Sequence, residues 1–382
     1  MQGASFGGNL TTLSHGPWQP WVDRLLDRFS RRPQPAQRWP VLQVEVTSRC
    51  IMRCSFCPNK SLGAAWEHGD LPWEVFRDAI GPHLSRFELI YLQGWGEPLL
   101  HRDLWQMVRL AKAAGCQVGF TSCGGLLTEE HIEQIIAERV DLLSISFAGA
   151  SAAVHESLRV GSDFERLLGN VRRLTERREE RTQLYLELHY LMMRPNMDDL
   201  PPFVSLAASL GADEVVATNL TYAFTPELDA QHVFGPAPEP AHEALIAEAR
   251  EEAARLGLKF RAYPLATSEA VVECDARPTE TAFINCRGEV TPCVYLGLPV
   301  KEAAPRYCDG VNRPLPGLSF GNVRDGLLTV WEGPARKKFG AAFASRRAAG
   351  YSSLLVSATG GDAGALPAPP EPCRHCYKLL GV

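Results

Sequence analysis

Three cysteines close together in the sequence carry the first indication of chemistry. Cys50, Cys54 and Cys57 are spaced C-x3-C-x2-C and directly follow the apolar run 41–46. Cysteine thiolates are the usual protein ligands of iron–sulfur clusters. Three of them can hold three corners of a cubane [4Fe–4S] cluster, which leaves the fourth iron without a protein ligand. Because an open iron can bind a further molecule, this loop predicts a reactive centre.

Two plainer interpretations of the same loop stay open. A zinc site would need a fourth cysteine or histidine nearby, and none follows before His68. A disulfide would need an oxidising compartment, but residues 1–10 have neither the basic start nor the apolar core of a secretory signal peptide. The pattern therefore favours a metal centre in a cytoplasmic protein.

The cysteine spacing, on the loop after a first predicted strand, resembles the radical S-adenosylmethionine (SAM) superfamily. The resemblance implies that Cys50, Cys54 and Cys57 hold a [4Fe–4S] cluster whose open iron is chelated by the amino and carboxylate groups of SAM. It also implies that the reduced cluster cleaves SAM to a 5′-deoxyadenosyl radical, which takes hydrogen from a substrate. Phe56 matches the family's aromatic residue beside the adenine. Simple packing is the alternative role for its ring.

A second motif follows the second predicted strand. The segment Gly94-Trp95-Gly96-Glu97-Pro98 is similar to the family's G-G-E-P motif, with Trp95 in place of its first glycine. The resemblance implies that the backbone and the acidic side chain of this motif hold the SAM amino group. It assigns cofactor-binding roles to Gly94, Gly96, Glu97 and Pro98. Glycines after a strand often only form a turn, so the motif gains its weight from lying one β/α unit after the cysteine loop.

Two further residues fit the same resemblance. Ser146, at the end of the fourth predicted strand, matches a family serine that contacts SAM, although Ala148 replaces the usual aspartate nearby. Arg159 falls where related enzymes place an arginine near the methionyl carboxylate, and a guanidinium suits a planar anion. The alternatives are a hydroxyl that bonds the backbone for Ser146 and a surface ion pair for Arg159.

A second group of cysteines lies near the C-terminus. Cys274, Gly288 and Cys293 form C-x13-G-x4-C, and a C-x2-C pair stands six residues before the end. This arrangement resembles the SPASM and twitch domains of many radical SAM enzymes. A full SPASM domain has further cysteines after the pair, so the shorter twitch form is expected, with one auxiliary [4Fe–4S] cluster. Its four ligands are then Cys274, Cys293, Cys373 and Cys376. A four-cysteine zinc site is the alternative.

Four cysteines stand outside both groups. Cys116 and Cys123 belong to the predicted barrel, Cys286 and Cys308 lack motif spacing, and most of the four are expected to be small buried hydrophobic residues. Cys123, just past the third predicted strand, is expected to face the active-site end. His189 and Met192 on the fifth predicted strand are candidates for lining the cavity, with core packing as the alternative.

The elements that must position these residues alternate between short β-rich runs and helical patterns, as in a parallel sheet. Strands are predicted over 41–46, 89–92, 117–121, 141–147, 184–192 and 214–218. The segment Ser162-Asp-Phe-Glu165 predicts a capping box that opens the fourth helix, and Gly115 and Gly211 predict helix ends. Six such units allow a partial (β/α)6 TIM-like barrel or an open doubly wound sheet. The resemblance selects the barrel, an α/β fold followed by a small Cys-rich SPASM/twitch-like domain.

The pattern divides the chain into four parts. They are an N-terminal extension with a short helix over 17–38 (1–39), the radical SAM barrel core (40–235), a bridging helix and strand (236–265) and the auxiliary-cluster domain (266–382). A low-complexity linker is expected over 357–372. At 382 residues the chain exceeds the size at which a single core stops growing, so about two folded domains are expected.

The composition narrows the range of functions. With 45% hydrophobic residues, 22% charged residues and a formal net charge of −5, nothing favours nucleic acid or an anionic membrane as a partner. No apolar stretch approaches the roughly 18 residues of a membrane-spanning helix. Eleven cysteines in a chain without a secretory signal indicate metal or redox work.

Three functions follow from these expectations. The first is a radical SAM enzyme that oxidatively modifies a peptide or protein, served by an external one-electron donor of the flavodoxin or ferredoxin type. The second is a dehydrogenase of a small sugar-like or aminocyclitol-like alcohol in natural-product or cofactor biosynthesis. The third is an iron–sulfur electron-transfer protein without catalysis, against which the intact SAM motifs argue. The sequence assigns no catalytic acid or base.

Overall fold

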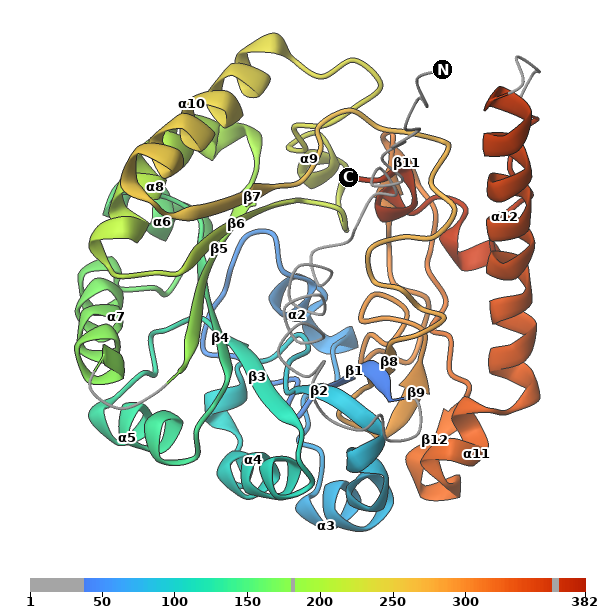
Figure 1. Ribbon diagram of the computed structural model, residues 1–382, viewed down its shortest axis with the longest axis horizontal. Helices are drawn as coiled ribbons and strands as arrows, with labels where there is room; N and C mark the ends of the chain where they lie inside the picture. Colours follow the sequence, from blue (N-terminus) through green and yellow to red (C-terminus); the bar gives the residue numbers. More distant parts are fainter. Residues whose placement is uncertain (1–37, 180–182, 359–363) are drawn as a thin grey trace, which may run out of the picture.

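A curved parallel sheet organises the molecule. The computed structural model describes residues 38–179, 183–358 and 364–382. Within them, seven parallel strands lie side by side in the order of the sequence (Figure 1). They are β1 (Trp39–Val44), β2 (Phe87–Tyr91), β3 (Gln117–Ser122), β4 (Leu142–Phe147), β5 (Tyr185–Met192), β6 (Glu214–Asn219) and β7 (Lys259–Ala262). Parallel strands are covered on their faces by helices, which explains the short apolar runs that form them.

Helices cover the outer, convex face of the sheet (Figure 1). The main ones are α4 (Leu104–Ala113), α5 (Glu129–Ala137), α6 (Ala152–Leu158), α7 (Phe164–Glu179), α8 (Leu200–Ser209) and α10 (Pro240–Leu256). Between β1 and β2 the chain instead forms shorter pieces: α2 (Pro58–Ser61), a 3-10 turn (Gly63–Ala65), α3 (Trp73–Val75), a π-helical turn (Phe76–Ile80) and a 3-10 turn (Gly81–Arg86). Other short pieces are the 3-10 turns Pro98–Leu100 and Arg194–Asp199 and the helix α9 (Pro226–Asp229).

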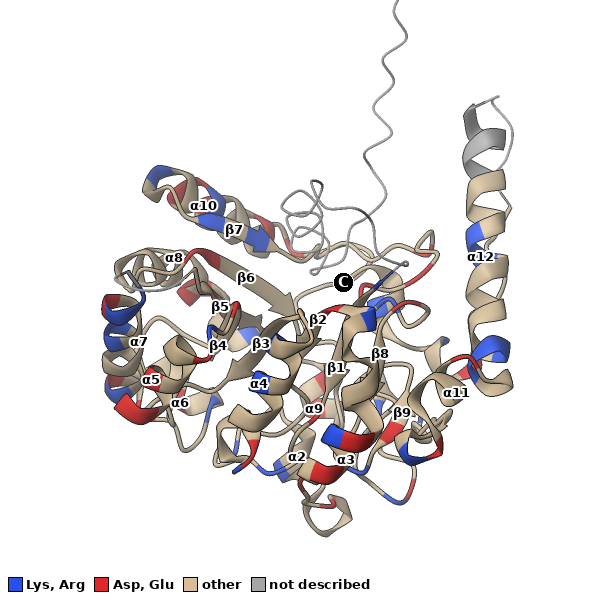
Figure 2. Ribbon diagram, turned by 60° about the horizontal axis from the view of Figure 1, so that its bottom comes forward, with Lys and Arg blue, Asp and Glu red and all other residues tan. Residues whose placement is uncertain are grey.

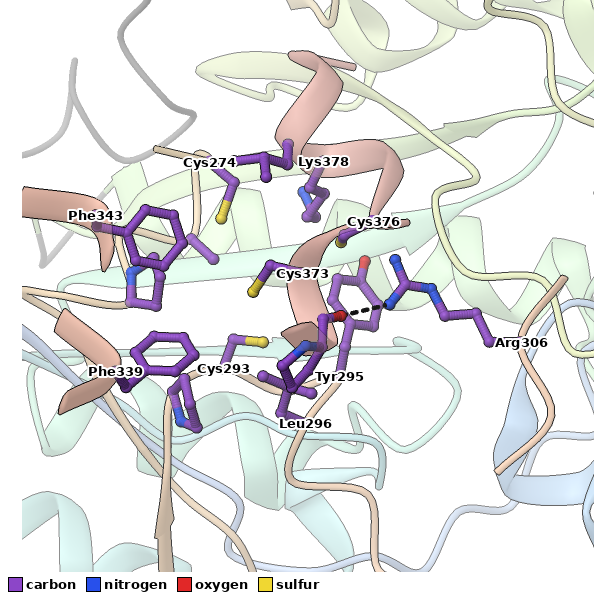
Figure 3. A pocket seen from close by; sticks show the side chains of 15 residues that line it. Cys274, Cys293, Tyr295, Leu296, Arg306, Phe339, Phe343, Cys373, Cys376 and Lys378 are labelled. Carbon is purple, nitrogen blue, oxygen red and sulfur yellow. Dashed lines mark hydrogen bonds between the residues drawn. The ribbon is translucent and has the colours of Figure 1, made fainter. Parts of the chain in front are cut away.

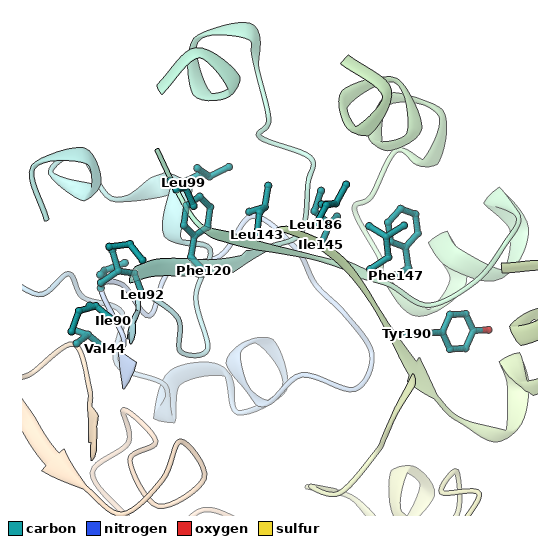
Figure 4. Packing of buried hydrophobic residues seen from close by; sticks show 14 of the residues in the cluster. Val44, Ile90, Leu92, Leu99, Phe120, Leu143, Ile145, Phe147, Leu186 and Tyr190 are labelled. Atoms are coloured by element: carbon teal, nitrogen blue, oxygen red, sulfur yellow. The ribbon is translucent and has the colours of Figure 1, made fainter. Parts of the chain in front are cut away.

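Alternate residues of each strand face these helices and form the core. On β4, Leu143, Ile145 and Phe147 are fully buried on that side (Figure 4). Phe147 packs against Phe203 of α8, with 5.1 Å between the ring centroids. Because neighbouring residues of a strand point to opposite faces, Ser144 and Ser146 face the interior of the curved sheet.

The C-terminal part extends the same sheet. β8 (Ala282–Ile284) pairs in parallel with β1, β9 (Glu289–Thr291) pairs antiparallel with β8, and β12 (Gly321–Asn322) pairs antiparallel with β9. The remaining elements are β10 (Tyr307–Cys308), β11 (Val311–Asn312), α11 (Leu327–Trp331), α12 (Pro334–Ala358) and the 3-10 turns Val323–Asp325, Glu371–Cys373 and Tyr377–Leu380. The pairing of β8 with β1 fixes this part beside the strand that leads into the first cysteine loop.

The predicted parallel α/β core is confirmed, and two local expectations change. The strand predicted only as part of a bridge is β7, which pairs with β6 as a seventh parallel strand. The predicted capping box at Ser162 is wrong, because α7 begins at Phe164 and the Asp163 side chain accepts a hydrogen bond from the Arg166 N–H at 3.0 Å. Ser162 instead lies 3.1 Å from the ring of His155. Asp163 is an equally good capping residue and stands one position closer to the helix.

Charges of both signs are spread over the outer helices, as α7 and α10 show (Figure 2). No helix in the described ranges is long and apolar enough to cross a membrane. Apart from residue 38, the helix predicted over 17–38 lies outside the described residues, as do residues 359–363 of the predicted linker. Residues 364–370 of that linker have no regular secondary structure.

Candidate metal centres

The first cysteine loop lies at the carboxyl end of β1. It is held by two backbone hydrogen bonds to the C-terminal end of α6 and the residues just after it, from Ser55 N to Leu158 O (2.9 Å) and from Arg53 N to Val160 O (2.8 Å). Cys54 is buried. It packs with Met52 and Cys123, and Cys50, Phe56 and Cys57 lie against the same cluster. The three cysteines of the motif therefore meet in one place.

The thiols of this loop sit in an apolar environment. Burial, the largest cause, raises the pKa of Cys50 to about 11 and that of Cys57 to about 12, and the neighbouring Cys54 adds to both shifts. Without a cation such thiols stay protonated. Binding of cluster iron supplies positive charge and releases the protons, so these residues fit a metal centre whose assembly is coupled to thiol deprotonation.

The Gly94–Pro98 segment is fitted closely onto the end of β1. A Cβ atom on Gly96 would lie 2.2 Å from the carbonyl oxygen of Thr47, and one on Gly94 would lie 2.4 Å from the Cβ of Glu45. The Glu97 N–H donates to Arg49 O at 2.8 Å. Only glycine at position 96 allows this approach of two backbones, which puts the motif directly beside the cysteine loop.

The side chain of Glu97 holds the loop after β3. It is buried, and its carboxylate accepts hydrogen bonds from Ser122 Oγ (2.9 Å), Cys123 N (2.7 Å) and Leu99 N (3.2 Å). The expected contact of Glu97 with the SAM amino group stays a prediction. In the structure the carboxylate ties together the loops after β2 and β3. Pro98 is buried and begins the 3-10 turn after β2.

Arg159 reaches the first cysteine loop. Its Nη1 lies 4.0 Å from Cys54 Sγ, and its guanidinium carbon lies 5.5 Å from the centroid of the Phe56 ring. The Nε atom of Arg159 is buried and has no hydrogen-bond partner among the described residues. The alternative of a surface ion pair therefore does not fit. A buried donor directed into this site is suited to an anionic group of a ligand.

A row of polar side chains crosses the inner face of the sheet. Tyr91 Oη lies 2.7 Å from Thr121 Oγ1 and 3.0 Å from Ser144 Oγ. Ser144 donates to Glu187 Oε2 at 3.1 Å, and His189 Nε2 lies 3.0 Å from the same oxygen. The sequence analysis missed all of this row except His189. The alternation of polar and apolar residues in L-L-S-I-S-F and Y-L-E-L-H-Y is the signal that could have found it.

Of the residues predicted for the site on β4 and β5, Ser146 and His189 lie on the inner face of the sheet and Met192 does not. Ser146 pairs in register with His189, two residue pairs further along the strands than Ser144 and Glu187, so both lie on the inner face near the carboxyl ends of the strands. No side-chain hydrogen bond joins Ser146 to the cysteine loop within the described residues. Met192 is fully buried in the core under the helices. The expectation that Met192 lines the cavity is wrong, because its position on β5 gives it the opposite face from His189.

The C-terminal cysteines line a common pocket. Cys274, Cys293, Cys373 and Cys376 surround it, as Figure 3 shows, although they come from three separate segments. Its other walls are largely apolar, with side chains such as Leu296, Phe339, Phe343 and Leu379, and two cationic residues, Arg306 and Lys378, also line it. Sequence analysis had no signal for these two cations.

The thiols around the pocket lie in an apolar environment. Burial raises the pKa of Cys293 to about 11 and also raises the pKa of Cys274 and Cys373, and neighbouring thiols contribute to each shift. Thiols that lie around a shared space match the larger body of a cubane.

The remaining cysteines divide as expected from the sequence. Cys116, Cys286 and Cys308 are buried, and Cys116 donates to Leu84 O at 3.1 Å. Cys123 packs against Cys54, so it does face the first centre. All eleven cysteines are free of disulfides.

An open parallel barrel with a three-cysteine loop at its first strand and a four-cysteine pocket beside it defines a two-centre iron–sulfur protein. Comparison with known families agrees. Residues 44–203 match the radical SAM superfamily, and residues 274–377 match SPASM, an iron–sulfur cluster-binding domain. The chain belongs to the radical SAM superfamily and carries a C-terminal SPASM domain. These domains bind SAM, a SAM-binding [4Fe–4S] cluster and an auxiliary iron–sulfur cluster.

Similar proteins have varied names. A tungsten-containing aldehyde ferredoxin oxidoreductase cofactor-modifying protein of Pyrococcus furiosus is 26% identical over 76% of this chain and 80% of its own length. An AdoMet-dependent heme synthase of Methanosarcina barkeri is 24% identical over 66% of this chain and 76% of its own. The mycofactocin maturase of Mycolicibacterium smegmatis is 28% identical, over 50% of this chain and 46% of its own.

Solved structures share the fold. SuiB of Streptococcus suis bound to its precursor peptide SuiA superposes with a TM-score of 0.58 at 13% identity, over 83% of this chain and 69% of that one. The AdoMet-bound enzyme anSMEcpe gives a TM-score of 0.56 at 14% identity, over 78% of this chain and 79% of that one. At this level of identity the likeness concerns the fold, and it agrees with a partial TIM-like barrel core.

Proposed function

We propose that this radical SAM enzyme oxidatively modifies a peptide or protein, as a maturase does. Cys50, Cys54 and Cys57 hold the SAM-binding cluster, and the four C-terminal cysteines hold the auxiliary cluster. The observation that carries the proposal is the presence of both thiol groups in one molecule, one with three thiols and one with four. With SAM bound, the first cluster supplies a 5′-deoxyadenosyl radical that removes hydrogen from the substrate.

The residues around the first centre bind and orient SAM in this proposal. Arg159 directs its half-buried guanidinium to the methionyl carboxylate, and Phe56 provides an apolar wall beside the adenine. Gly96 and Glu97 set the shape of the loop beside the open iron. Gly94 and Pro98 fix the two ends of that loop, and Ser146 faces the same interior from β4.

The division of the chain proposed from the sequence is kept. The core spans 40–235 and the auxiliary domain 266–382, and each encloses one of the two matched family regions. The bridge 236–265 contributes α10 and β7 to the edge of the sheet. We further propose that the enzyme works in the cytoplasm, because its free thiols need a reducing compartment. A flavodoxin- or ferredoxin-type protein then supplies the electron.

The names of similar proteins support a polypeptide substrate. The mycofactocin maturase, a PqqA peptide cyclase of Rhodopseudomonas palustris and the SuiB complex with its precursor peptide are all named for peptides. A second candidate has its own support. Two relatives that are matched over most of their own length are named for a cofactor-modifying protein and a heme synthase. Oxidation of a small molecule in cofactor or natural-product biosynthesis, including a sugar-like alcohol, is therefore the alternative.

Assay of the anaerobically reconstituted, reduced protein tests the proposal in two steps. SAM alone is expected to yield 5′-deoxyadenosine and methionine; if neither forms, the radical SAM activity is refuted. Short peptides encoded beside the gene are then added, and a mass loss of two hydrogens or a new cross-link is expected in one of them. Turnover of a small alcohol or porphyrin-type substrate, with every peptide unchanged, would establish the alternative instead. The Cys50/Cys54/Cys57→Ala variant is the control.

A further inference from the structure

Arg306 is a buried cation that holds the turn between the last two cysteines. It is only 4% exposed. Its Nη1 donates to Pro372 O at 3.1 Å and its Nη2 to His375 O at 2.5 Å, so the guanidinium spans the turn that carries Cys373 and Cys376. Figure 3 shows it at the edge of the pocket that the four cysteines line.

The charge of Arg306 has no carboxylate partner among the described residues. The other cation of the pocket differs, because Lys378 Nζ forms an ion pair with Asp275 Oδ2 at 2.6 Å. Arg306 meets only neutral carbonyl oxygens. Burial of an unpaired charge is costly unless an anion lies nearby. The groups around Arg306 that can become anionic are thiols, and Cys376 exerts the largest electrostatic effect on it.

A second buried arginine holds the segment that leads to Cys274. Arg346 of α12 is 5% exposed, and it donates to Val271 O at 2.6 Å and to Val272 O at 3.2 Å. These carbonyls precede Cys274 in the chain. No ion pair involves Arg346 in the described part of the chain either. Two uncompensated guanidiniums thus hold the segments that carry Cys274 and the Cys373–Cys376 turn.

We propose that Arg306, assisted by Arg346, is the counter-cation of the auxiliary cluster and raises its reduction potential. This rests on the proposed assignment of the four C-terminal cysteines as cluster ligands. Reduction adds one electron to an already anionic cluster and its thiolates. A fixed positive charge nearby therefore stabilises the reduced form more than the oxidised form, and a low-dielectric site strengthens the effect. Arginine keeps its proton throughout, so the electron moves without a proton.

The consequence is a direction for electron flow. A substrate that has lost a hydrogen atom must lose one more electron to become an oxidised product. Arg306 makes the auxiliary cluster a better acceptor for that electron. The proton is released separately to solvent or to a base. In this role Arg306 is a positioning residue: it touches the turn that holds the ligands and no reacting atom.

An EPR-monitored redox titration tests the proposal without SAM or substrate. The full chain with Cys50, Cys54 and Cys57 changed to Ala leaves the auxiliary cluster as the single source of signal. Arg306→Gln is expected to shift the ratio of oxidised to reduced cluster at least tenfold toward oxidised at the parent midpoint, which is a fall of about 59 mV for one electron. Arg306→Lys, which keeps the charge, should recover most of that shift.

Arg374→Gln is the matched control. Arg374 lies in the same turn, but it is half exposed and pairs with Glu371 at 2.8 Å, so its loss should leave the midpoint nearly unchanged. A potential for Arg306→Gln equal to that of the control overturns the proposal. If Arg306→Gln assembles no cluster, a cluster with the parent potential in Arg306→Lys supports the proposal. If neither variant assembles a cluster, the role of Arg306 is purely structural and the proposal is overturned. A parent protein without auxiliary iron would instead refute the ligand assignment.

Discussion

The two thiol groups of this molecule are built in opposite ways. The first takes three cysteines from one loop, within residues 50–57, at the end of a single strand. The second takes four cysteines from segments that span residues 274–376, and the fold brings them together. The first is bordered by a buried Arg159 Nε atom without a partner among the described residues. The second is enclosed by phenylalanine and leucine side chains.

This contrast suits the first thiol group to a reaction on a bound ligand and the second to electron transfer. Three thiols leave one iron of a cubane free to bind SAM, whereas four thiols complete the coordination and leave no position for a ligand. A local loop can keep one side open to the barrel interior, where the polar row from Tyr91 to His189 lies. A site assembled from distant segments becomes enclosed, which suits an electron acceptor.

Loss of the cysteines should separate the two centres most strongly. In the Cys50/Cys54/Cys57→Ala variant, iron is expected to fall from about eight to about four per chain, and 5′-deoxyadenosine should fall to the level of a protein-free control. Cys373/Cys376→Ala should also lower the iron content toward about four, but it should retain SAM cleavage in the absence of substrate. Anaerobic iron and sulfide analysis with product quantitation measures both. Equal loss of SAM cleavage in the two variants would refute the division of roles.

The pH should affect the stability of the protein through Glu45, a buried carboxyl group that contacts both regions. The buried carboxylate of Glu45 accepts hydrogen bonds from Trp95 N (2.8 Å) in the first region and Cys286 N (3.1 Å) in the second. Burial, the largest cause, raises the pKa of Glu45 from 4.5 to about 7, although both N–H groups oppose the shift. The folded state therefore binds more protons than the unfolded state between these values. Stability should fall as pH rises through this window, by about 3 kcal/mol in total.

Denaturation between pH 4 and 8 measures that dependence. The comparison is the difference between the parent and Glu45→Gln, because other titrating groups affect both proteins alike. The amide side chain of the variant cannot ionise, so the variant should lack the decline in the free energy of unfolding contributed by Glu45. Parallel curves for the two proteins would show that this carboxyl does not link the regions by its protonation.

Crowding at Gly96 gives a smaller expected effect. A Cβ there would lie 2.2 Å from Thr47 O and 2.7 Å from Arg49 O, both backbone atoms that cannot move without distorting the cysteine loop. Gly96→Ala should cost about 1–3 kcal/mol of stability through overpacking and should weaken SAM cleavage. Gly69→Ala is the control, since no atom lies within 4 Å of its Cβ position. Thermal unfolding under anaerobic conditions compares the two, and equal melting temperatures would contradict the close contact.

The sequence revealed the first region far better than the second. Cys50, Cys54 and Cys57 lie in one short loop, and the Gly94–Pro98 motif is also contiguous, so the resemblance of both to family motifs could be recognised from local sequence. The parallel strands were predictable because each is a short apolar run. Local competition explains the error at α7, where Ser162 and Asp163 are adjacent capping residues and the backbone selects only one.

Long-range contacts could not be predicted. The pairing of β8 with β1 joins residues about 240 positions apart, as Val44 and Ile284 show, and no local pattern specifies it. Arg306 and Arg346 lie in a loop and a helix and belong to no motif, and only the fold reveals that both lie buried beside cysteine segments. Two of the partners of Glu97, Ser122 and Cys123, likewise depend on where the end of β3 lies.

The mildest test concerns the arginine of the first region. Arg159 and Arg306 are both beside cysteines, but the proposal gives them different tasks: Arg159 binds SAM and Arg306 stabilises negative charge on a cluster. Arg159→Gln should therefore weaken SAM binding about tenfold, or about 1.4 kcal/mol, through the loss of a charge-assisted hydrogen bond. Equilibrium binding of SAM to the reconstituted protein measures it, with Arg306→Gln as the comparison. If Arg306→Gln weakens SAM binding and Arg159→Gln leaves the SAM affinity unchanged, the two assignments are wrong. If each arginine only stabilised nearby thiolates, the two variants should change SAM affinity to a similar extent. The difference in SAM affinity between the variants is therefore the informative quantity.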